Sequence, residues 1–165
     1  MTSSTDRIEK RVMLRAPHER VWRAVSDSEE FGNWFGLELD GRFTPGAQMR
    51  GRLKPTIADA DIAKMQEKYA GHPLALYVDQ IEPMSTFSFR WHPFALDPAV
   101  DYSSEPMTLV TFTLEAVEGG TLLTITESGF DAVPLARRAD AFEANEEGWA
   151  MMTGVIEKYL HQPRS

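Results

Sequence analysis

The chain has 165 residues, of which 42% are hydrophobic and 25% charged, values typical of a globular protein with a sizeable core. Its formal net charge of −8 at pH 7 argues against binding to nucleic acid or to an anionic membrane, since both require clustered lysine and arginine. The absence of cysteine excludes disulfides, thiol nucleophiles and cysteine-ligated metals.

The sequence also argues against a membrane or secreted location. No apolar run approaches the roughly 20 residues that a membrane-spanning helix needs. The segment Met1–Arg7 is polar and lacks the apolar stretch of a signal peptide. We therefore expect a single cytoplasmic domain over residues 1–165, with an ordered core at about 7–161 and no membrane insertion.

The first predicted element is a strand. Polar and apolar residues alternate over residues 7–15, and one face carries Ile8, Lys10, Val12 and Leu14. This alternation predicts a strand with one buried face.

Two short helices are predicted next. Pro17 suits the first turn of a helix, and Val21 and Val25 follow at helical spacing. Asp27 then offers a cap for a second helix over residues 29–34.

The rest of the chain is mostly strands. Runs of apolar and β-branched residues bounded by turn residues predict strands at 37–43, 47–53, 74–81, 86–92, 107–117 and 121–128. In the strand at 86–92, Phe87, Phe89 and Trp91 share one face. Residues 93–106 contain three prolines and little periodicity, which indicates a loop.

An insertion at about residues 55–72 interrupts the strand pattern. Ile62, Met65 and Tyr69 fall at helical spacing, so we expect a short amphipathic helix there. This helix is either a lid over a binding site or a packed surface insertion.

A long helix is predicted over Pro134–His161. Its apolar residues form a stripe at helical spacing, made of Phe142, Trp149, Met152, Ile156, Tyr159 and Leu160. Since no other element is long enough to cover a curved antiparallel sheet, the sequence predicts an α+β domain of six or seven strands closed by this helix.

The order of these elements resembles the SRPBCC superfamily (START-like, Bet v-like), in particular the branch of activators of the ninety-kilodalton heat-shock chaperone ATPase. The resemblance extends over about Arg7–Leu160 and is carried by Ala16-Pro17, Val21-Trp22, Phe31–Phe35, Ile81-Glu82-Pro83, Phe87–Trp91, Leu122–Phe130 and Glu147-Gly148-Trp149. It implies a helix-grip fold, in which a curved antiparallel sheet wraps around the C-terminal helix with a deep cavity between them.

Such a cavity would hold a small hydrophobic or aromatic molecule. The residues expected to contribute to it, or else to pack as ordinary core, are Trp34, Phe35, Met49, Tyr77, Phe89, Trp91, Phe112, Glu127, Phe130, Trp149 and Met152. Methionine suits such a pocket because its side chain adapts to different ligands.

Glu127 is the most unusual of these residues. It keeps phase with Leu123 and Ile125, so a regular strand places a carboxylate on the same face as two apolar side chains. There it either lines the cavity or rises clear of the core at the strand end. A desolvated carboxylate would be held neutral or would find an arginine partner. Glu127 is thus a candidate acid–base residue, with Arg90 and His92 as candidate partners.

No recognised catalytic motif accompanies Glu127. The chain has no Gly-x-Ser-x-Gly, no phosphate-binding glycine loop and no dinucleotide fingerprint. The four histidines, His18, His72, His92 and His161, are isolated, so we expect neither a metal nor a cofactor.

Three functions remain open. The first is binding of a small hydrophobic or aromatic ligand by a monomer or homodimer. The second is an enzyme of the cyclase, aromatase or hydrolase kind that acts on a small aromatic substrate. The third is a co-chaperone-like interaction module with a chaperone as partner, which the resemblance alone implies.

Overall fold

The structure is a computed structural model that describes residues 6–161 except 96 and 98. Its seven strands form one antiparallel sheet in the order β1-β7-β6-β5-β4-β3-β2. The strands are β1 (Arg7–Leu14), β2 (Leu37–Leu39), β3 (Gln48–Leu53), β4 (Pro73–Glu82), β5 (Thr86–Trp91), β6 (Thr108–Val117) and β7 (Gly120–Ser128). The parts of the expected domain at residues 1–5 and 162–165 lie outside the described residues.

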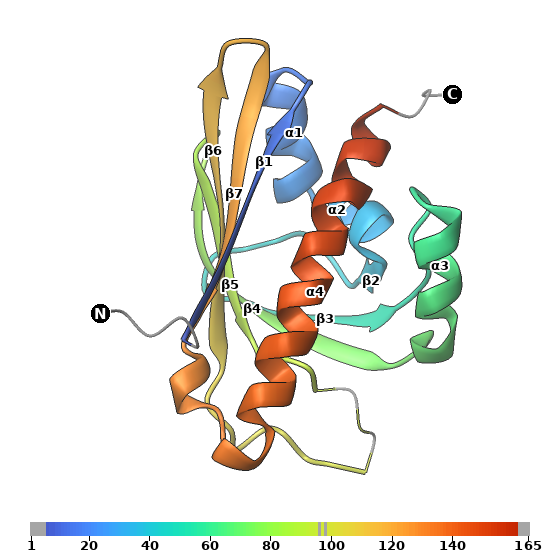
Figure 1. Ribbon diagram of the computed structural model, residues 1–165, viewed down its shortest axis with the longest axis vertical. Helices are drawn as coiled ribbons and strands as arrows, with labels where there is room; N and C mark the ends of the chain where they lie inside the picture. The colour runs from blue at the N-terminus through green and yellow to red at the C-terminus, as the bar shows by residue number, and fades with distance from the viewer. Residues whose placement is uncertain (1–5, 96, 98, 162–165) are drawn as a thin grey trace.

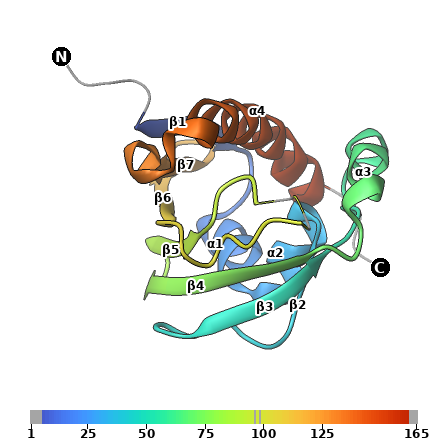
Figure 2. The same cartoon turned by 90° about the horizontal axis from the view of Figure 1, so that it is seen from below.

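Helices occupy the concave side of this sheet. They are α1 (His18–Ser26), α2 (Ser28–Phe35), α3 (Ala60–Gln66), α4 (Leu135–Leu160) and the short 3₁₀ turns η1 (Glu67–Tyr69) and η2 (Phe130–Ala132). Figures 1 and 2 show the sheet curving around α1 and α2, with α4 crossing its open side and α3 at the edge. The expected α+β helix-grip fold is confirmed.

The break between α1 and α2 has a local cause. The Asp27 carboxylate accepts hydrogen bonds of 3.0 Å from the backbone N–H groups of Glu29 and Glu30, which caps α2. At the C-terminal end of α2, Gly36 adopts a φ of 93°, a left-handed conformation that ends helices and favours glycine. These two residues set α2 at an angle that brings Phe35, its last residue, toward α4.

One strand is shorter than its sequence pattern predicts. The strand expected at 37–43 ends at Leu39, because Gly41 adopts a φ of 105° and turns the chain out of the extended conformation. The chain then returns to the sheet as β3, where Gln48 begins the pairing with Tyr77 of β4.

The core is an aromatic cluster centred on Phe31 of α2. Its ring lies within 6.3 Å, centroid to centroid, of six other rings, those of Trp34, Phe35, Phe43, Phe87, Phe89 and Phe112. The shared face predicted for Phe87, Phe89 and Trp91 is confirmed, since all three side chains are buried. The cluster fills the space between the sheet and the first two helices, and the remaining space lies toward α4.

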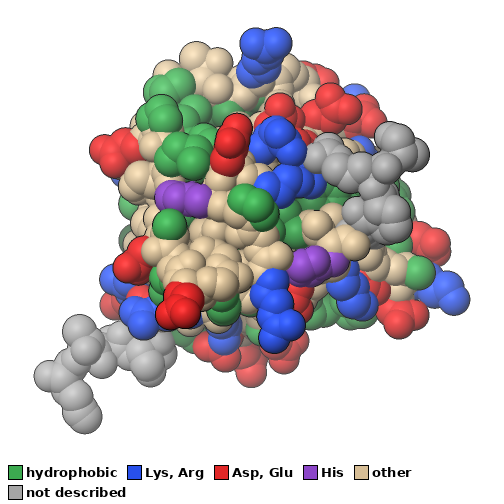
Figure 3. All heavy atoms as spheres, turned by 90° about the horizontal axis from the view of Figure 1, so that it is seen from above, with side chains coloured by type: hydrophobic (Ala, Val, Ile, Leu, Met, Phe, Trp, Pro, Cys, Tyr) green, Lys and Arg blue, Asp and Glu red, His purple; other side chains and the backbone are tan. Residues whose placement is uncertain are grey.

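Acidic and basic side chains are interspersed on the face of the molecule that Figure 3 shows. Within the described part of the chain, no helix combines the length and the apolar character that crossing a bilayer requires.

Candidate functional site

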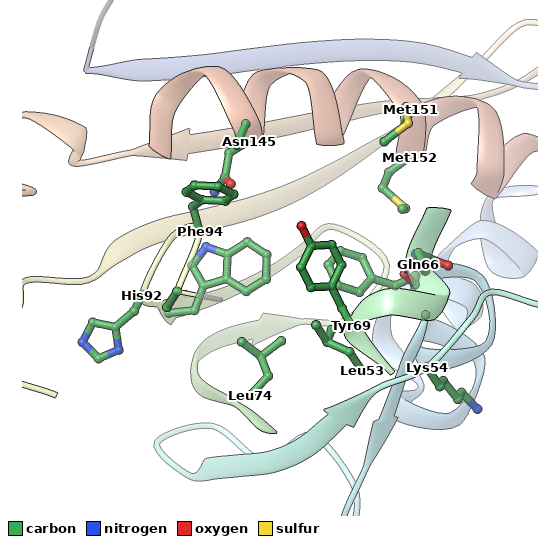
Figure 4. A pocket seen from close by; sticks show the side chains of 15 residues that line it. Leu53, Lys54, Gln66, Tyr69, Leu74, His92, Phe94, Asn145, Met151 and Met152 are labelled. Atoms are coloured by element: carbon green, nitrogen blue, oxygen red, sulfur yellow. Dashed lines mark hydrogen bonds between the residues drawn. The ribbon is translucent and has the colours of Figure 1, made fainter. Parts of the chain in front are cut away.

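A cavity of about 290 Å³ lies where α2 and α4 meet the insertion and the loop after β5. Its walls are mainly apolar and include Phe35, Leu53, Leu74, Trp91, Phe94 and Met152. Figure 4 shows Tyr69 reaching into it from below and Met152 from α4 above, whereas Lys54 and His92 point outward. An apolar cavity with few polar groups is typical of small-molecule sites.

A second hollow of about 160 Å³ continues the first beneath α4. Five of its seven lining residues also line the larger cavity, and Trp149 is one of the two that do not. The two hollows therefore form one continuous candidate site along the inner face of α4.

Glu127 lies directly behind the wall of this site. Its side chain is fully buried, and Nε1 of Trp91 and Oγ1 of Thr108 donate to its Oε2 at 2.7 and 2.5 Å. Nε1 of Trp149 donates to Oε1 at 2.8 Å, and Nδ2 of Asn145 donates to Oε1 and Oε2 at 2.9 and 3.1 Å. We call these four donor residues the Glu127 cage.

The cage matches the hydrogen-bonding chemistry of a carboxylate. Indole N–H groups and the amide NH₂ only donate, and a carboxylate only accepts. The arginine partner considered from the sequence is absent from these contacts, and neutral donors surround the carboxylate instead. Glu127 lines neither hollow, whereas Trp91, Asn145 and Trp149 do, so the carboxylate orients wall residues rather than facing the cavity.

The candidate partners of Glu127 lie elsewhere. Arg90 is on the outer face of the sheet, half-exposed, with its Nη2 3.8 Å from Oδ1 of Asp79. His92 lines the larger cavity, and its Nε2 donates to the carbonyl oxygen of Glu105 at 3.0 Å. Neither is within hydrogen-bonding distance of Glu127, so the structure does not assemble an acid–base group from these three residues.

The other expected ligand-binding residues fall into three groups. Phe35, Trp91 and Met152 line the larger cavity, and Trp149 lines the smaller hollow. Tyr77 is part of a separate surface hollow and accepts a hydrogen bond of 2.8 Å from Gln48. The residues buried in the core and outside both hollows are Trp34, Met49, Phe89, Phe112 and Phe130.

Sequence reasoning missed Asn145. It lies four residues before Trp149, which places both side chains on the same face of α4, and this spacing was the available signal. A polar residue that shares the apolar face of a helix with an aromatic residue expected to line the cavity indicates a polar contact inside that cavity.

The insertion forms one wall of the cavity and is fixed to its neighbours. Gln66 donates from Nε2 to the carbonyl oxygen of Phe35 at 3.1 Å and accepts from the backbone N–H of Thr56 at 2.8 Å. Lys158 of α4 contacts Asp59, the N-cap of α3, at 2.6 Å. The Lys158 hydrogen bond lowers the pKa of Asp59, and Asp59 raises the pKa of Lys158 in return. These contacts fit the packed arrangement better than a free lid.

The loop after β5 closes the opposite rim. His72 donates to the carbonyl oxygen of Ala95 at 3.0 Å, while Arg137 bonds the Glu105 carboxylate at 2.8 Å and the Phe94 carbonyl oxygen at 3.3 Å. Phe94 has a φ of 52°, unusual for a residue with a side chain. Contacts from His72, just before β4, and from Arg137 of α4 therefore fix the loop backbone at Phe94 and Ala95, both of which line the cavity.

Metal ligands are not gathered at this site. Over residues 6–161, leaving out 96 and 98, no group of three or more histidine, cysteine, aspartate or glutamate side chains is arranged to hold a metal ion.

Fold and cavity together define a helix-grip domain, and the family follows from the sequence. The family model described as Activator of Hsp90 ATPase homolog 1-like protein matches residues 15–161. The chain therefore belongs to this family, which confirms the resemblance found in its motifs. Among curated proteins, the search finds no match.

Solved structures share the fold. MLL2253 from Mesorhizobium loti has a TM-score of 0.68 at 23% identity, with 96% of this chain and 99% of that one covered. The Aha1 dimer from Colwellia psychrerythraea has a TM-score of 0.66 at 16% identity, with coverage of 96% and 98%. DynU16, a protein in the dynemicin biosynthetic locus, has a TM-score of 0.66 at 25% identity over 95% of this chain. The match covers only 48% of DynU16, so this chain spans about half of that protein.

Proposed function

We propose that this protein binds a small hydrophobic or aromatic molecule in the cavity beneath α4. The observation that carries the proposal is an apolar hollow of about 290 Å³ whose aromatic wall is held in place by a buried carboxylate. Binding pockets for small molecules begin at roughly 300 Å³, so this space suits a ligand of one or two rings.

The aromatic wall favours a flat ligand. The ring centroids of Phe35 and Trp91 are 6.0 Å apart, those of Phe35 and Trp149 5.7 Å, and those of Trp91 and Trp149 5.9 Å. Aromatic rings prefer offset-stacked or edge-to-face contacts at such separations, and a planar guest can join this arrangement. Met151 and Met152 on the helix side adapt to its outline.

The comparison with DynU16 supports a small-molecule ligand rather than a macromolecular one. That protein belongs to a biosynthetic locus, and the match to it covers almost the whole of this chain. We carry over the class of ligand only, because half of DynU16 has no counterpart here.

Binding is testable by filling the cavity. Ala144 lines both hollows, whereas Ala150 lies exposed on the same helix. Isothermal titration calorimetry with naphthalene and 2-naphthol should detect saturable binding to the wild type. We expect Ala144→Leu to weaken that binding by about 10-fold or more, because the added atoms occupy the site. Ala150→Leu should bind as the wild type does.

Two results would contradict the proposal. One is the absence of binding by any member of a panel of one- and two-ring compounds. The other is equal binding by Ala144→Leu and Ala150→Leu, which would place the ligand outside this cavity.

A further inference from the structure

The orientation of the Asn145 amide is determined by its neighbour. Nδ2 lies 2.9 and 3.1 Å from the two carboxylate oxygens of Glu127. The nitrogen and oxygen of an asparagine are difficult to distinguish by shape, but a carboxylate offers only acceptors. The NH₂ group must therefore face Glu127, and the amide oxygen must face away from it.

The amide oxygen consequently faces the candidate site. Asn145 lines both hollows, as Trp91 does, and Figure 4 shows the Asn145 side chain descending from α4 beside Phe94. In the part of the chain that the structure describes, no group donates a hydrogen bond to Oδ1. Since Oδ1 has no partner among these described residues and is not one of the fully buried unpaired atoms, it is accessible. The oxygen can therefore accept a hydrogen bond from a guest in the cavity.

The surroundings make this acceptor effective. An amide whose N–H groups donate to a carboxylate is polarised, which strengthens its oxygen as an acceptor. The nearby wall consists of Phe35, Trp91 and Met152, so a hydrogen bond formed there is little weakened by water. The Glu127 carboxylate lies directly behind the amide, and its negative charge disfavours an anionic guest.

We infer that the ligand is an uncharged aromatic molecule that carries a hydroxyl or N–H group and donates it to Oδ1 of Asn145. This inference rests on the proposed function, because it concerns the same cavity. It narrows the ligand class from hydrophobic molecules in general to phenol-like and aromatic amine-like ones. Glu127 is then a positioning residue, which acts on the ligand only through Asn145.

The test compares matched ligands. Calorimetry measures the affinity of 2-naphthol, 2-naphthylamine and 2-methoxynaphthalene, of which the last keeps the oxygen but lacks the donor. We expect the two donors to bind about 3- to 10-fold more tightly than the methoxy compound, as one neutral hydrogen bond provides. In Asn145→Leu this preference should fall to about one. Glu146→Gln, at an exposed position on α4, should retain it.

Should Asn145→Leu fail to fold, Asn145→Ala takes its place, and the wild-type preference remains measurable in either case. Equal affinity of the three ligands for the wild type overturns the inference and leaves the proposed function intact. The same holds if the preference for donors persists without Asn145. If none of the three ligands binds the wild type, the inference fails, and the proposed function fails with it when naphthalene and the other one- and two-ring compounds do not bind either.

Discussion

Two of the carboxylates that helix α4 contacts, Glu127 and Glu30, are satisfied in opposite ways. Near the middle of the helix, Glu127 is fully buried and accepts only from the neutral donors of its cage. Near its end, Glu30 is paired with Arg20 at 2.7 Å and Arg23 at 2.9 Å, and Tyr159 of α4 donates to it at 3.1 Å. The Glu30 side chain remains 13% exposed. The contacts of Glu127 lie beside the cavity, whereas those of Glu30 join α1, α2 and α4 near the surface.

The difference follows from the cost of burying charge. Removing a second ion from water costs several kcal/mol, so arginine partners are tolerated at the edge, where their charge keeps some hydration. Beside the cavity, neutral donors satisfy Glu127 without bringing a cation into an apolar space. The contacts of Glu30 join helices, whereas the Glu127 cage also orients Trp91, Asn145 and Trp149 in the wall of the cavity.

The largest expected effect comes from Glu127→Gln. The glutamine amide can adopt two orientations. In one its NH₂ group faces the indole N–H of Trp91, and in the other it faces that of Trp149, so two donors oppose each other in both cases. We expect a loss of about 2–4 kcal/mol in unfolding free energy, since a buried donor is left unpaired and several charge-assisted hydrogen bonds weaken. Urea denaturation measures it, and Glu115→Gln, at an exposed position of β6, should change stability by less than about 0.5 kcal/mol. A Glu127→Gln loss as small as that of the control would show that the cage is not stabilising.

Glu30→Gln should cost less, about 1 kcal/mol, because the side chains of Arg20 and Arg23 remain 16% and 47% exposed. The same denaturation series, repeated at low salt and at about 1 M NaCl, separates the two carboxylates. The effect at Glu30 should shrink in high salt, whereas that at Glu127 should not. Equal salt sensitivity at the two positions would remove the distinction between them.

The smallest effect is expected at Tyr159. Its hydroxyl donates to Glu30, and burial followed by the Glu30 charge raises the pKa of Tyr159 above 10. The unfolded chain therefore loses this proton before the folded protein does, as the pH rises. The stability that Tyr159 contributes is complete below pH 10 and declines as the pH rises through the raised folded-state pKa.

Tyr159→Phe should thus cost about 0.5–1 kcal/mol near pH 8 and lose less stability than the wild type on going to pH 11. Urea denaturation at both pH values measures the difference, and Tyr77→Phe, on an exposed side chain, serves as the control. A parallel decline of wild type and Tyr159→Phe would mean that this hydroxyl does not titrate differently in the folded protein.

Local patterns predict much of this fold. The alternation around Phe87, Phe89 and Trp91 gives the buried face of β5, and the apolar spacing of the last helix gives Trp149 and Met152. Such inferences succeed because strand and helix periodicities depend on neighbours in the sequence.

The site is less accessible to such reasoning, because it is made by contacts between distant segments. Trp91, Thr108, Asn145 and Trp149 come from three elements that meet around Glu127 only when the sheet curves and α4 crosses it. The phase of β7 indicates that Glu127 points inward. It does not indicate that the partners are neutral donors, or that the carboxylate is covered rather than open to the cavity.

The insertion has a consequence for how this architecture can diversify. Residues 60–69 line the cavity through Gln66 and Tyr69, yet α3 and η1 belong to no strand pairing and contain no buried residue. The segment is tied to the core through Ile62 and Gln66, so substitutions at its other positions leave the seven-stranded sheet unchanged. Exchanging the cavity-facing Tyr69 would therefore reshape the cavity without altering any strand pairing, so that the same sheet can surround cavities of different outline.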